Sequence, residues 1–516
     1  MDSQTIQILI AMVIYMAIVI GIGLLFAKKA NQSSENYFLG GRSLGPWVTA
    51  LSAEASDMSG WLLMGLPGVA YWFGLADAAW TAIGLAIGTY VNWLIVSKRL
   101  RRYSVRANNA ITLPDFFSNR FREKNKVIMS LSALFILIFF TVYAASCFVT
   151  CGKLFSTLFG APYVTMMLVG AVFVLVYTIL GGFLAESASD FMQGVVMIVA
   201  LTVIVVISTV NAGGIGAVLE NAKSIPGFLD FFGLATPTLN GAGEQIVEAG
   251  VPVFGAASEY SVLQICSMLA WGLGYFGMPQ VLLRFMAIRK EEELTRSRRI
   301  AMVWVIISLA VAVFIGIVGR DLYPTAHLTK PAAENIFITL TTSSLPPILA
   351  GFVMAGILAA TISSSDSYLL IASSAVAKNI YQGIFKKDAS DKKVMRVSRI
   401  TLLVIAIIAM VIALDKNSII FNIVSFAWAG FGATFGPLML FSLFWKRTNR
   451  AGAIAGMVSG AGMVFLWKLV ISKLGGVFGI YELLPAFIFS SICIIVVSLL
   501  TAPPSKEIEE DFDSIK

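Results

Sequence analysis

Apolar stretches of about 20 residues recur along the whole chain, separated by short polar or glycine-rich segments. A helix of about 20 residues spans the ~30 Å hydrocarbon core of a bilayer. The pattern therefore predicts an all-α polytopic membrane protein with about thirteen membrane-spanning helices. These spans are expected at residues 5–27, 46–70, 76–97, 127–156, 162–181, 190–211, 259–281, 299–319, 347–376, 397–414, 418–444, 451–472 and 482–502.

The composition supports this class, because 58% of the 516 residues are hydrophobic and only 13% are charged. In water-soluble domains about a quarter of the residues are charged. The chain has no phosphate-binding loop of the form G-x-x-x-x-G-K-[ST] and no polar stretch long enough for an ATPase domain. Its single histidine, His327, disfavours a histidine metal centre. We therefore expect neither ATP-driven transport nor an embedded enzyme.

The basic residues gather in alternate loops, at 28–42, 98–126, 284–299, 378–399 and 446–450. This placement explains the net charge of +8 without nucleic-acid binding. By the positive-inside rule the N-terminus lies outside and the C-terminus inside, which requires an odd number of spans. Arg284 is counted here as a loop residue.

Three segments outside the spans carry further expectations. The loop 182–189 contains Glu186 and no base, so it should pack against protein. Residues 212–258 are rich in glycine, proline and asparagine and are expected to form an outside surface loop; a cap over a vestibule is the alternative. The acidic run Glu507–Glu510 is expected to be solvated.

Two spans contain residues that a bilayer helix normally avoids. The second carries Glu54 and Asp57 among several serines, and a buried ionised carboxylate costs several kcal/mol unless it is paired or hydrated. The seventh carries three glycines and Pro279, which disfavour helix by about 1 and 3 kcal/mol per residue. Both are predicted to break near the middle of the membrane, where unwound backbone must line protein or a cavity.

The spacing of these two breaks indicates a transporter. They lie five spans apart, and an odd shift reverses orientation across the membrane. Interrupted helices at matching places of two oppositely oriented units indicate the binding site of a secondary transporter. For either break alone, glycine-mediated helix packing remains the alternative.

The ninth span offers oxygen ligands for an ion. Ala360, Ser363 and Ser364 stand at i, i+3 and i+4, on one face of a helix. One carbonyl and two hydroxyls, completed by carbonyls from the second span, would make a neutral oxygen site that favours a monovalent hard cation such as Na⁺. The alternative for the serines is bonding within their own helix.

Aromatic residues near the breaks could surround an organic solute. Trp61 follows the first break, Trp271 and Tyr275 lie within the second, and Tyr143 lies in a polar stretch of the fourth span. Their faces can hold an apolar ring and attract an ammonium group. Freed backbone amides can hold a carboxylate, so a small zwitterion fits. Packing against helices or lipid is the alternative for each ring.

Several motifs carry a resemblance that covers essentially the whole chain. They are Gly40–Pro46, Ser56–Gly68, Trp271–Pro279, Arg284–Ala287 and Trp445–Gly456. They resemble the sodium:solute symporter family, in particular its bacterial sodium/proline branch. The resemblance implies a leucine-transporter-type fold in which spans 2–6 (46–211) and 7–11 (259–444) are inverted repeats. One helix precedes the repeats and two follow, so residues 1–502 form one transmembrane domain and 503–516 a cytoplasmic tail.

The resemblance also implies roles for individual residues. The sodium site would use the carbonyls of Ala55, Met58 and Ala360 and the hydroxyls of Ser363 and Ser364. The proline pocket maps to Gly60, Trp61, Tyr143, Trp271, Tyr275 and Pro279. Asp57 would order the broken helix together with Ser59, Arg42 matches an inside arginine important for coupling, and Asp190 matches a further family aspartate.

Two residues depart from the family pattern. Ser364 stands where the bacterial prototype has threonine, which keeps the hydroxyl. Glu54 stands where an uncharged residue is expected; we interpret it as a protonated or hydrated bystander, with proton coupling left open beside sodium coupling.

The expected function is import of L-proline with one Na⁺ per proline, by alternating access, across a bacterial cytoplasmic membrane. The expected partners are proline, Na⁺ and the lipid bilayer, and the oligomeric state stays open. A sodium- or proton-coupled symporter for another small solute is the alternative within this class. A channel is the alternative outside it, and it would need a continuous polar pore rather than paired breaks.

Overall fold

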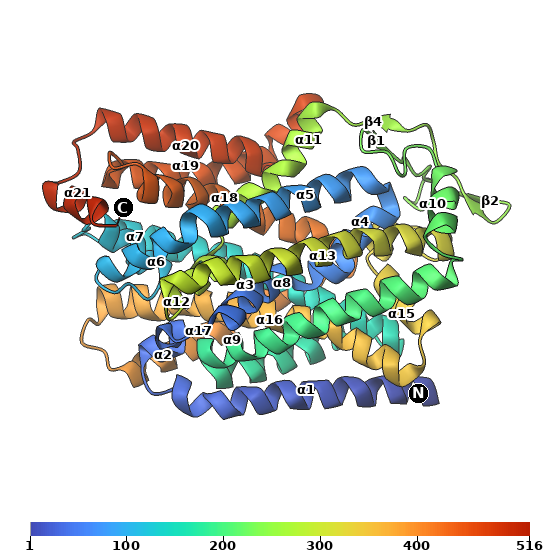
Figure 1. Cartoon of the computed structure of the whole chain (residues 1–516), viewed down its shortest axis with the longest axis horizontal. Helices are drawn as coiled ribbons and strands as arrows, with labels where there is room; N and C mark the ends of the chain where they lie inside the picture. Colours follow the sequence, from blue (N-terminus) through green and yellow to red (C-terminus); the bar gives the residue numbers. More distant parts are fainter. Residues whose placement is uncertain (1, 516) are drawn as a thin grey trace.

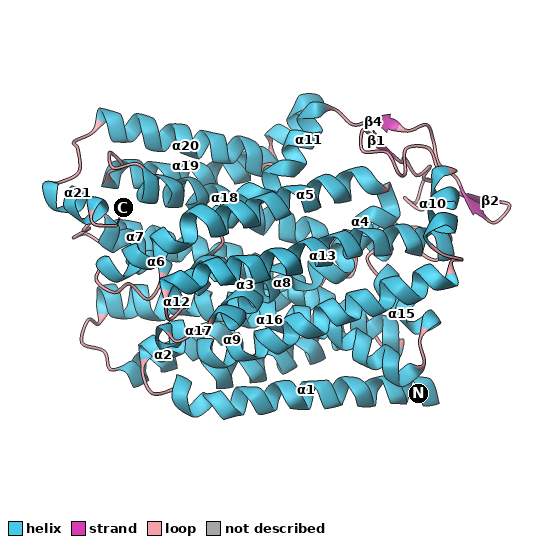
Figure 2. Ribbon diagram, viewed as in Figure 1, coloured by secondary structure: helices cyan, strands magenta, loops and turns pink. Residues whose placement is uncertain are grey.

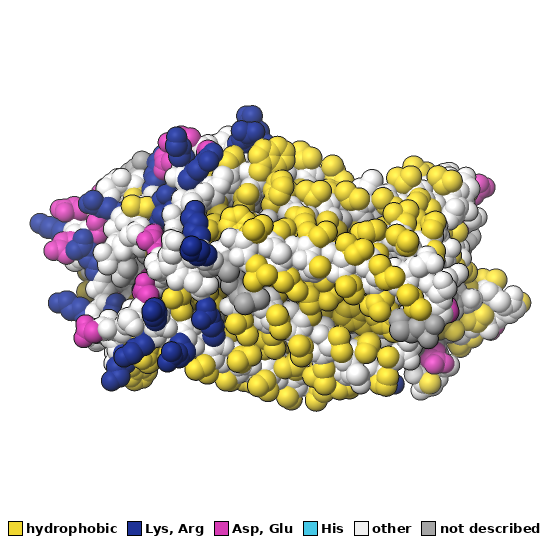
Figure 3. Space-filling model, turned by 90° about the horizontal axis from the view of Figure 1, so that it is seen from below, with side chains coloured by type: hydrophobic (Ala, Val, Ile, Leu, Met, Phe, Trp, Pro, Cys, Tyr) yellow, Lys and Arg dark blue, Asp and Glu magenta, His cyan; other side chains and the backbone are white. Residues whose placement is uncertain are grey.

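The computed structural model is a bundle of helices that run roughly along the long axis of the molecule (Figure 1). It describes the backbone of residues 2–515 and every side chain in that range except those at 27, 180 and 181. Figure 2 shows that strands are confined to one end of the bundle, which we call the loop end. Lysine and arginine side chains gather at the other end, the basic end, and hydrophobic side chains cover the belt between them (Figure 3).

Fifteen of the helices and half-helices build the bundle. They are α1 (Ser3–Ala30), α3 (Pro46–Gly60), α4 (Leu66–Phe73), α5 (Leu75–Val91), α6 (Ser97–Arg106), α8 (Val127–Phe159), α9 (Tyr163–Asn211), α11 (Val262–Leu269), α12 (Pro279–Ala287), α13 (Leu294–Leu322), α16 (Pro347–Ser374), α17 (Asp391–Ile412), α18 (Ile420–Phe444), α19 (Arg450–Leu469) and α20 (Leu483–Leu500).

Shorter elements connect them. The short helices are α2 (Ser34–Leu39), α7 (Leu113–Arg120), α10 (Ile215–Lys223), α14 (Lys330–Ala333), α15 (Ile336–Ser344) and α21 (Lys506–Asp513). In the segment predicted as a surface loop, β1 (Gly233–Leu234) pairs antiparallel with β4 (Ser258–Glu259), and β2 (Val247–Glu248) pairs with β3 (Val251–Pro252).

Within residues 2–515, ten helices are long and apolar enough to cross a membrane, and eleven if the bent pair Val262–Phe276 and Pro279–Ala287 is one span. The chain is therefore a multi-pass membrane protein. The two remaining predicted spans fall on Pro46–Phe73, which is interrupted, and on the shorter apolar helix Tyr163–Ile179. The count of thirteen, the inverted repeat and the orientation of the termini stay predictions.

The prediction of a loop at 182–189 is wrong, because these residues belong to helix α9. The chain turns instead at Gly182, whose φ of 60° and ψ of 179° interrupt an otherwise continuous helix. A backbone of this kind needs glycine, since a Cβ there would also lie 2.8 Å from the ring of Tyr37. Glu186 follows the turn and is buried against protein, as predicted.

The helices differ in how deeply they lie in the bundle. Helices α16 and α18 are buried over most of their length, whereas α1, α17, α19 and α20 turn most of their surface outward. The outward faces are apolar, as lipid requires. The buried helices α16 and α18 carry the candidate site together with the broken helices α3–α4 and α11–α12.

The acidic run of the tail is folded into a helix, and its acids Glu507 and Glu510 are exposed to solvent, as predicted. It forms helix α21, whose acids pair with bases of the α6–α7 segment and of the loop after α18. Phe512 is buried beneath the guanidinium groups of Arg99 and Arg120. The tail therefore lies across the basic end of the molecule.

Candidate functional site

The first broken helix is interrupted at a residue that is not glycine. Ser59 has φ 46° and ψ −169°, a backbone conformation that costs about 1–3 kcal/mol in a residue with a Cβ. Its hydroxyl accepts a hydrogen bond from the amide of Trp61 at 3.2 Å, which stabilises the turn. A π-helical turn, Trp61–Gly65, then leads into α4. The break predicted in the second span is thus present.

Serine hydroxyls from α16 meet the first broken helix just before this turn. Ser363 donates a hydrogen bond to the carbonyl of Ala55 at 2.8 Å, and Ser364 donates to the same carbonyl at 3.4 Å. Ser363 also lies 3.3 Å from the carbonyl of Ala360. The carbonyl of Met58 accepts instead from the amide of Trp61. Four of the five predicted sodium-site residues therefore share direct contacts, and all five are buried.

The chemistry of this cluster suits a monovalent hard cation. It consists of carbonyl and hydroxyl oxygens without a fixed charge. No group of three His, Cys, Asp or Glu side chains that could hold a metal occurs among the described residues. Hard cations take oxygen ligands, and a neutral set does little to offset a second positive charge.

Asp57 links the first broken helix to the second. Its Oδ1 accepts a hydrogen bond from the side chain of Gln280 in α12, at 3.1 Å. Its backbone carbonyl lies 3.4 Å from the hydroxyls of both Tyr143 and Tyr368. The predicted ordering role is consistent with these contacts, since Asp57 ties together α3, α8, α12 and α16.

Glu54 forms its hydrogen bond with Trp93 rather than with the serine cluster. Its Oε1 accepts a hydrogen bond from the indole of Trp93 at 3.1 Å, and the Trp93 ring packs on Phe285 at 4.5 Å between centroids. The carboxyl group is buried. The structure therefore places Glu54 in a separate contact between α3 and the turn after α5.

The second broken helix bends by 42° between Val262–Phe276 and Pro279–Ala287. Two of its carbonyls accept hydrogen bonds from side chains: Asn92 donates to the carbonyl of Tyr275 at 3.1 Å, and Trp428 donates to that of Trp271 at 2.8 Å. Pro279 occupies the first turn of α12, a position that needs no amide hydrogen.

The glycines of this segment also allow very close packing. A Cβ at Gly272 would lie 2.2 Å from the carbonyl oxygen of Gly84, and one at Gly277 would lie 2.3 Å from that of Phe431. Helix packing and helix breaking, which the sequence left as alternatives, therefore occur together here.

Aromatic rings fill the space between the two breaks. Trp61 and Trp271 lie 5.6 Å apart, and both contact Phe421 of α18, at 5.8 and 5.2 Å. Tyr275 packs edge-on against Trp428 at 5.0 Å. The indole nitrogen of Trp61 and the hydroxyl of Tyr275 are buried without a hydrogen-bond partner in the part of the chain that the structure describes.

Tyr143 lies in a second aromatic stack rather than among the tryptophans. Its ring stacks on Tyr368 at 4.2 Å, and Tyr368 stacks on Phe140 at 5.1 Å. The structure thus brings Trp61, Trp271 and Tyr275 into one cluster and places Tyr143 in a separate stack that contacts the carbonyl of Asp57. Phe421, Trp428 and Tyr368 were not predicted, because an aromatic residue in an apolar helix gives no sequence signal that separates it from packing.

Arg284 is the main residue that sequence reasoning missed, and its placement in a loop is wrong. It lies within α12 and is fully buried. Its guanidinium donates to Glu186, to Asp190 at 3.1 Å and to the hydroxyl of Ser52 at 2.9 Å. This hub joins α3, α9 and α12, and it explains Asp190 as a partner of a buried cation. The unbalanced acid Glu186 was the available signal.

Arg42 closes the basic end beside the first broken helix. It donates to the carbonyls of Ala110 at 2.8 Å and Met286 at 2.6 Å and to the side chain of Asn109 at 3.0 Å. Burial and the neighbouring charge of Arg101 lower the pKa of Arg42 to about 10, which leaves it charged at neutral pH. It therefore holds the α6–α7 connection against the end of α12.

A buried ion pair closes the loop end. Lys153 of α8 and Glu334 lie 2.5 Å apart, with side-chain exposures of 5% and 2%. The Glu334 carboxylate also accepts the first amides of α18, those of Ile420 and Phe421, each at 3.0 Å. Because Phe421 contacts Trp61 and Trp271, this carboxylate fixes the ring that covers the aromatic cluster.

Comparisons with known sequences add an independent finding. A family model described as the sodium:solute symporter family matches residues 37–460. A sodium/proline symporter of Staphylococcus aureus (strain USA300) is 41% identical over 516 residues, covering 99% of this chain and 96% of that protein.

Solved structures share the arrangement of helices. A substrate-bound, outward-open Na⁺-coupled sialic acid symporter superposes with a TM-score of 0.77 at 18% identity, covering 97% of this chain and 99% of that one. MhsT in complex with L-phenylalanine superposes with a TM-score of 0.51 at 14% identity, covering 88% and 97%. These likenesses show that the chain has a transporter fold of the leucine-transporter type.

Proposed function

The chain belongs to the sodium:solute symporter family, and from this membership we propose that it imports L-proline together with Na⁺, one ion per proline, by alternating access. The relative from Staphylococcus aureus, a sodium/proline symporter, supports proline as the solute. The observation that carries the proposal is the meeting of Ser363 and Ser364 on the carbonyl of Ala55, beside a helix break.

The serine cluster supports sodium as the driving ion. A bound Na⁺ would replace the hydrogen bonds to the Ala55 carbonyl, since each hydroxyl can turn its lone pairs toward a cation. The ion would then bridge α3 and α16 and fix the turn at Ser59. That turn leads directly into Trp61, so ion binding and the aromatic cluster share one short segment of backbone.

The aromatic cluster supports a small zwitterion with an apolar body. The faces of Trp61 and Trp271 suit a pyrrolidine ring and its ammonium group. The unpartnered indole nitrogen of Trp61 and hydroxyl of Tyr275 are two donors for a carboxylate. Burying such donors without a partner costs about 1–3 kcal/mol each, which a bound carboxylate would recover.

Each end of the bundle has its own closure, as alternating access requires. The Lys153–Glu334 pair with the amides of α18 would open toward the outside, and the contacts of Arg42 would open toward the inside. The Asp57–Gln280 bond joins the two broken helices, so a change at one is felt at the other.

One ion supplies enough energy for accumulation. A cation that crosses ~100 mV gains ~2.3 kcal/mol. A tenfold gradient adds ~1.4 kcal/mol, so the total of ~3.7 kcal/mol supports roughly 500-fold accumulation of a neutral solute. A second coupled ion is not needed for uptake of this size.

The test is the substitution Ser363→Ala, compared with Ser365→Ala in the same helix. The Ser365 hydroxyl bonds only its own helix, to the carbonyl of Thr361 at 2.6 Å and that of Ile362 at 3.3 Å. Uptake of labelled proline into proteoliposomes is measured with Na⁺, Li⁺ or H⁺ gradients imposed separately. Ser363→Ala should weaken both Na⁺ and proline binding about tenfold or more, because a hydrogen bond to a charged group contributes ~1.5–3 kcal/mol.

The control Ser365→Ala should stay within about twofold of the unmodified protein. Unchanged proline affinity in Ser363→Ala, with the Na⁺ dependence retained, would show that the ion binds elsewhere. Uptake driven as well by a proton gradient alone would favour the second candidate, a proton-coupled symporter. The observation that favours this candidate is the buried carboxyl group of Glu54.

A further inference from the structure

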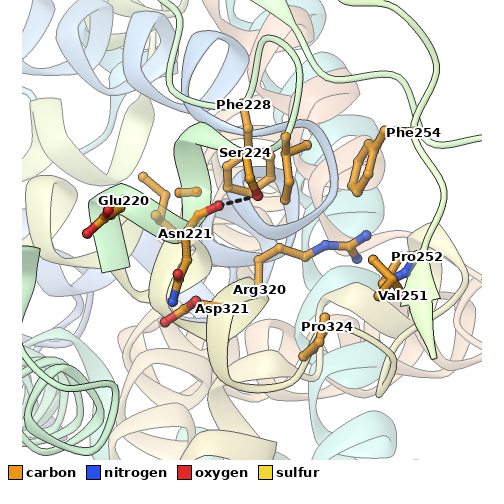
Figure 4. A pocket seen from close by; sticks show the side chains of 13 residues that line it. Glu220, Asn221, Ser224, Phe228, Val251, Pro252, Phe254, Arg320, Asp321 and Pro324 are labelled. Atoms are coloured by element: carbon orange, nitrogen blue, oxygen red, sulfur yellow. Dashed lines mark hydrogen bonds between the residues drawn. The ribbon is translucent and has the colours of Figure 1, made fainter. Parts of the chain in front are cut away.

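We propose that a cavity at the loop end is a second solute site. It binds small organic carboxylates, in particular amino acids, and this binding does not require sodium. The cavity has a volume of about 310 Å³ and lies between α10, the turn that contains β3, and the end of α13 (Figure 4). It is distant in sequence from the serine cluster and shares none of its residues. The proposal does not rest on the central site.

The cavity is bordered by a buried arginine that lacks a counter-ion. Arg320, in the last turn of α13, is 2% exposed. One terminal nitrogen donates to the neutral side chain of Gln245 at 2.6 Å. Its Nε and other terminal nitrogen have no hydrogen-bond partner among residues 2–515, and no carboxylate there forms an ion pair with it.

The rings beside Arg320 do not replace a counter-ion. Its guanidinium lies 4.9 Å from the ring centre of Tyr71 and 4.7 Å from that of Phe254. Cation–π contacts contribute about 0.5–2 kcal/mol. Removing a cation from water costs several kcal/mol, so the balance favours an anion bound at this guanidinium. Arg320 is one of the residues that line the cavity, so an anion bound there would lie beside this side chain.

The remaining walls favour an organic anion over an inorganic one. Ile225, Phe228 and Ile317 supply apolar surface, and the volume far exceeds the roughly 30 Å³ that one water molecule occupies. Figure 4 shows Glu220 and Asp321 on the opposite side of the cavity from the guanidinium. A carboxylate at Arg320 with an ammonium group toward these acids describes an amino acid.

Arg320 in the cavity wall contacts the outer half of the first broken helix through the ring of Tyr71. Tyr71 belongs to α4, and its hydroxyl donates to the carbonyl of Tyr323 at 2.8 Å. Gly316 of α13 packs against the same half-helix so closely that a Cβ would lie 2.3 Å from the carbonyl oxygen of Pro67. An occupant at Arg320 would therefore stabilise α4 in its place against α13.

The experiment measures binding of labelled L-proline to the full-length protein in sodium-free buffer, where the central site lacks its ion. The unmodified protein should show saturable binding, and Arg320→Gln should weaken it about tenfold or more. Ser224→Phe, which fills the cavity and leaves Arg320 in place, should weaken it similarly. The control Lys223→Gln removes an exposed charge from the same helix α10, outside the cavity, and should leave binding unchanged.

Two further arms separate the ligand classes and the two sites. Cyclopentanecarboxylate should compete with proline, whereas chloride at equal concentration should not. Ser363→Ala should keep the sodium-free binding and lose only the sodium-dependent part, so failure of the central site is recognised separately. The proposal is overturned if the unmodified protein shows no saturable sodium-free binding, if chloride alone competes, or if Arg320→Gln and Ser224→Phe both bind as before.

Discussion

The two broken helices look alike in the sequence but are built differently. In the first, a serine with positive φ interrupts the helix, and hydroxyls from α16 reach a carbonyl at the turn. In the second, glycines bring backbones into direct contact, and the side chains of Asn92 and Trp428 already occupy the exposed carbonyls.

The difference assigns separate tasks to the two breaks. In the first, the carbonyl of Ala55 accepts hydrogen bonds from two hydroxyls, which a cation can replace. In the second, the carbonyls of Trp271 and Tyr275 accept from side chains, and the segment contributes the rings of these two residues and the Gln280 side chain that reaches Asp57. Two breaks that look alike in the sequence therefore need not have the same chemistry.

The largest expected effect comes from adding a methyl group at the second break. Gly277→Ala would place a Cβ 2.3 Å from the carbonyl oxygen of Phe431, against backbone that cannot move aside. We expect a loss of stability of about 3 kcal/mol or more, since overpacking costs ~1–3 kcal/mol even where side chains can shift. Thermal unfolding of the purified protein measures this. Gly462→Ala is the control, because nothing lies within 4 Å of its Cβ position.

A smaller effect is expected at the first break, from Ser59→Gly compared with Ser59→Ala. Both variants lose the hydroxyl that accepts the amide of Trp61, but only alanine keeps the Cβ that is unfavourable at φ 46°. The glycine variant should therefore be more stable than the alanine variant, by roughly 1 kcal/mol. Equal melting temperatures would mean that the turn is not strained and that the hydroxyl alone determines it.

The smallest effect is expected for Glu54→Gln. The glutamine carbonyl can still accept the hydrogen bond from Trp93, and no contact of Glu54 reaches the serine cluster. The sodium concentration that gives half-maximal proline uptake should change by less than about twofold, at both pH 6 and pH 8. A variant that lost its sodium dependence, or gained a dependence on pH, would show that Glu54 takes part in coupling. The Glu54–Trp93 contact could then no longer be treated as separate from the serine cluster.

The sequence was informative where a residue contradicts its surroundings. Carboxylates and serines in one span, and glycines with a proline in another, are unusual in lipid, so both breaks could be located. The face formed by Ala360, Ser363 and Ser364 follows from helical spacing alone. The partner of that face, Ala55, came from family resemblance rather than from spacing.

What the sequence could not supply was contact between distant segments. Arg284 looks like one more loop base, and only the fold brings it to Glu186 and Asp190, about one hundred residues away. Phe421 looks like any residue of an apolar span until Glu334 fixes the start of its helix. The ion pairs of the acidic tail could not be predicted for the same reason, because its basic partners lie as far away as Arg106.

Because the tail packs on the basic end, a label attached at the C-terminus should disturb the protein more than one attached at the N-terminus. Ser3 at the start of α1 is exposed, so an affinity tag there should leave the bundle undisturbed. A fluorescent protein fused after residue 516 would begin two residues beyond the buried side chain of Ile515 and would pull on α21. Washing in molar salt would weaken the attachment of α21 further, because the Debye length falls to ~3 Å and exposed ion pairs are screened.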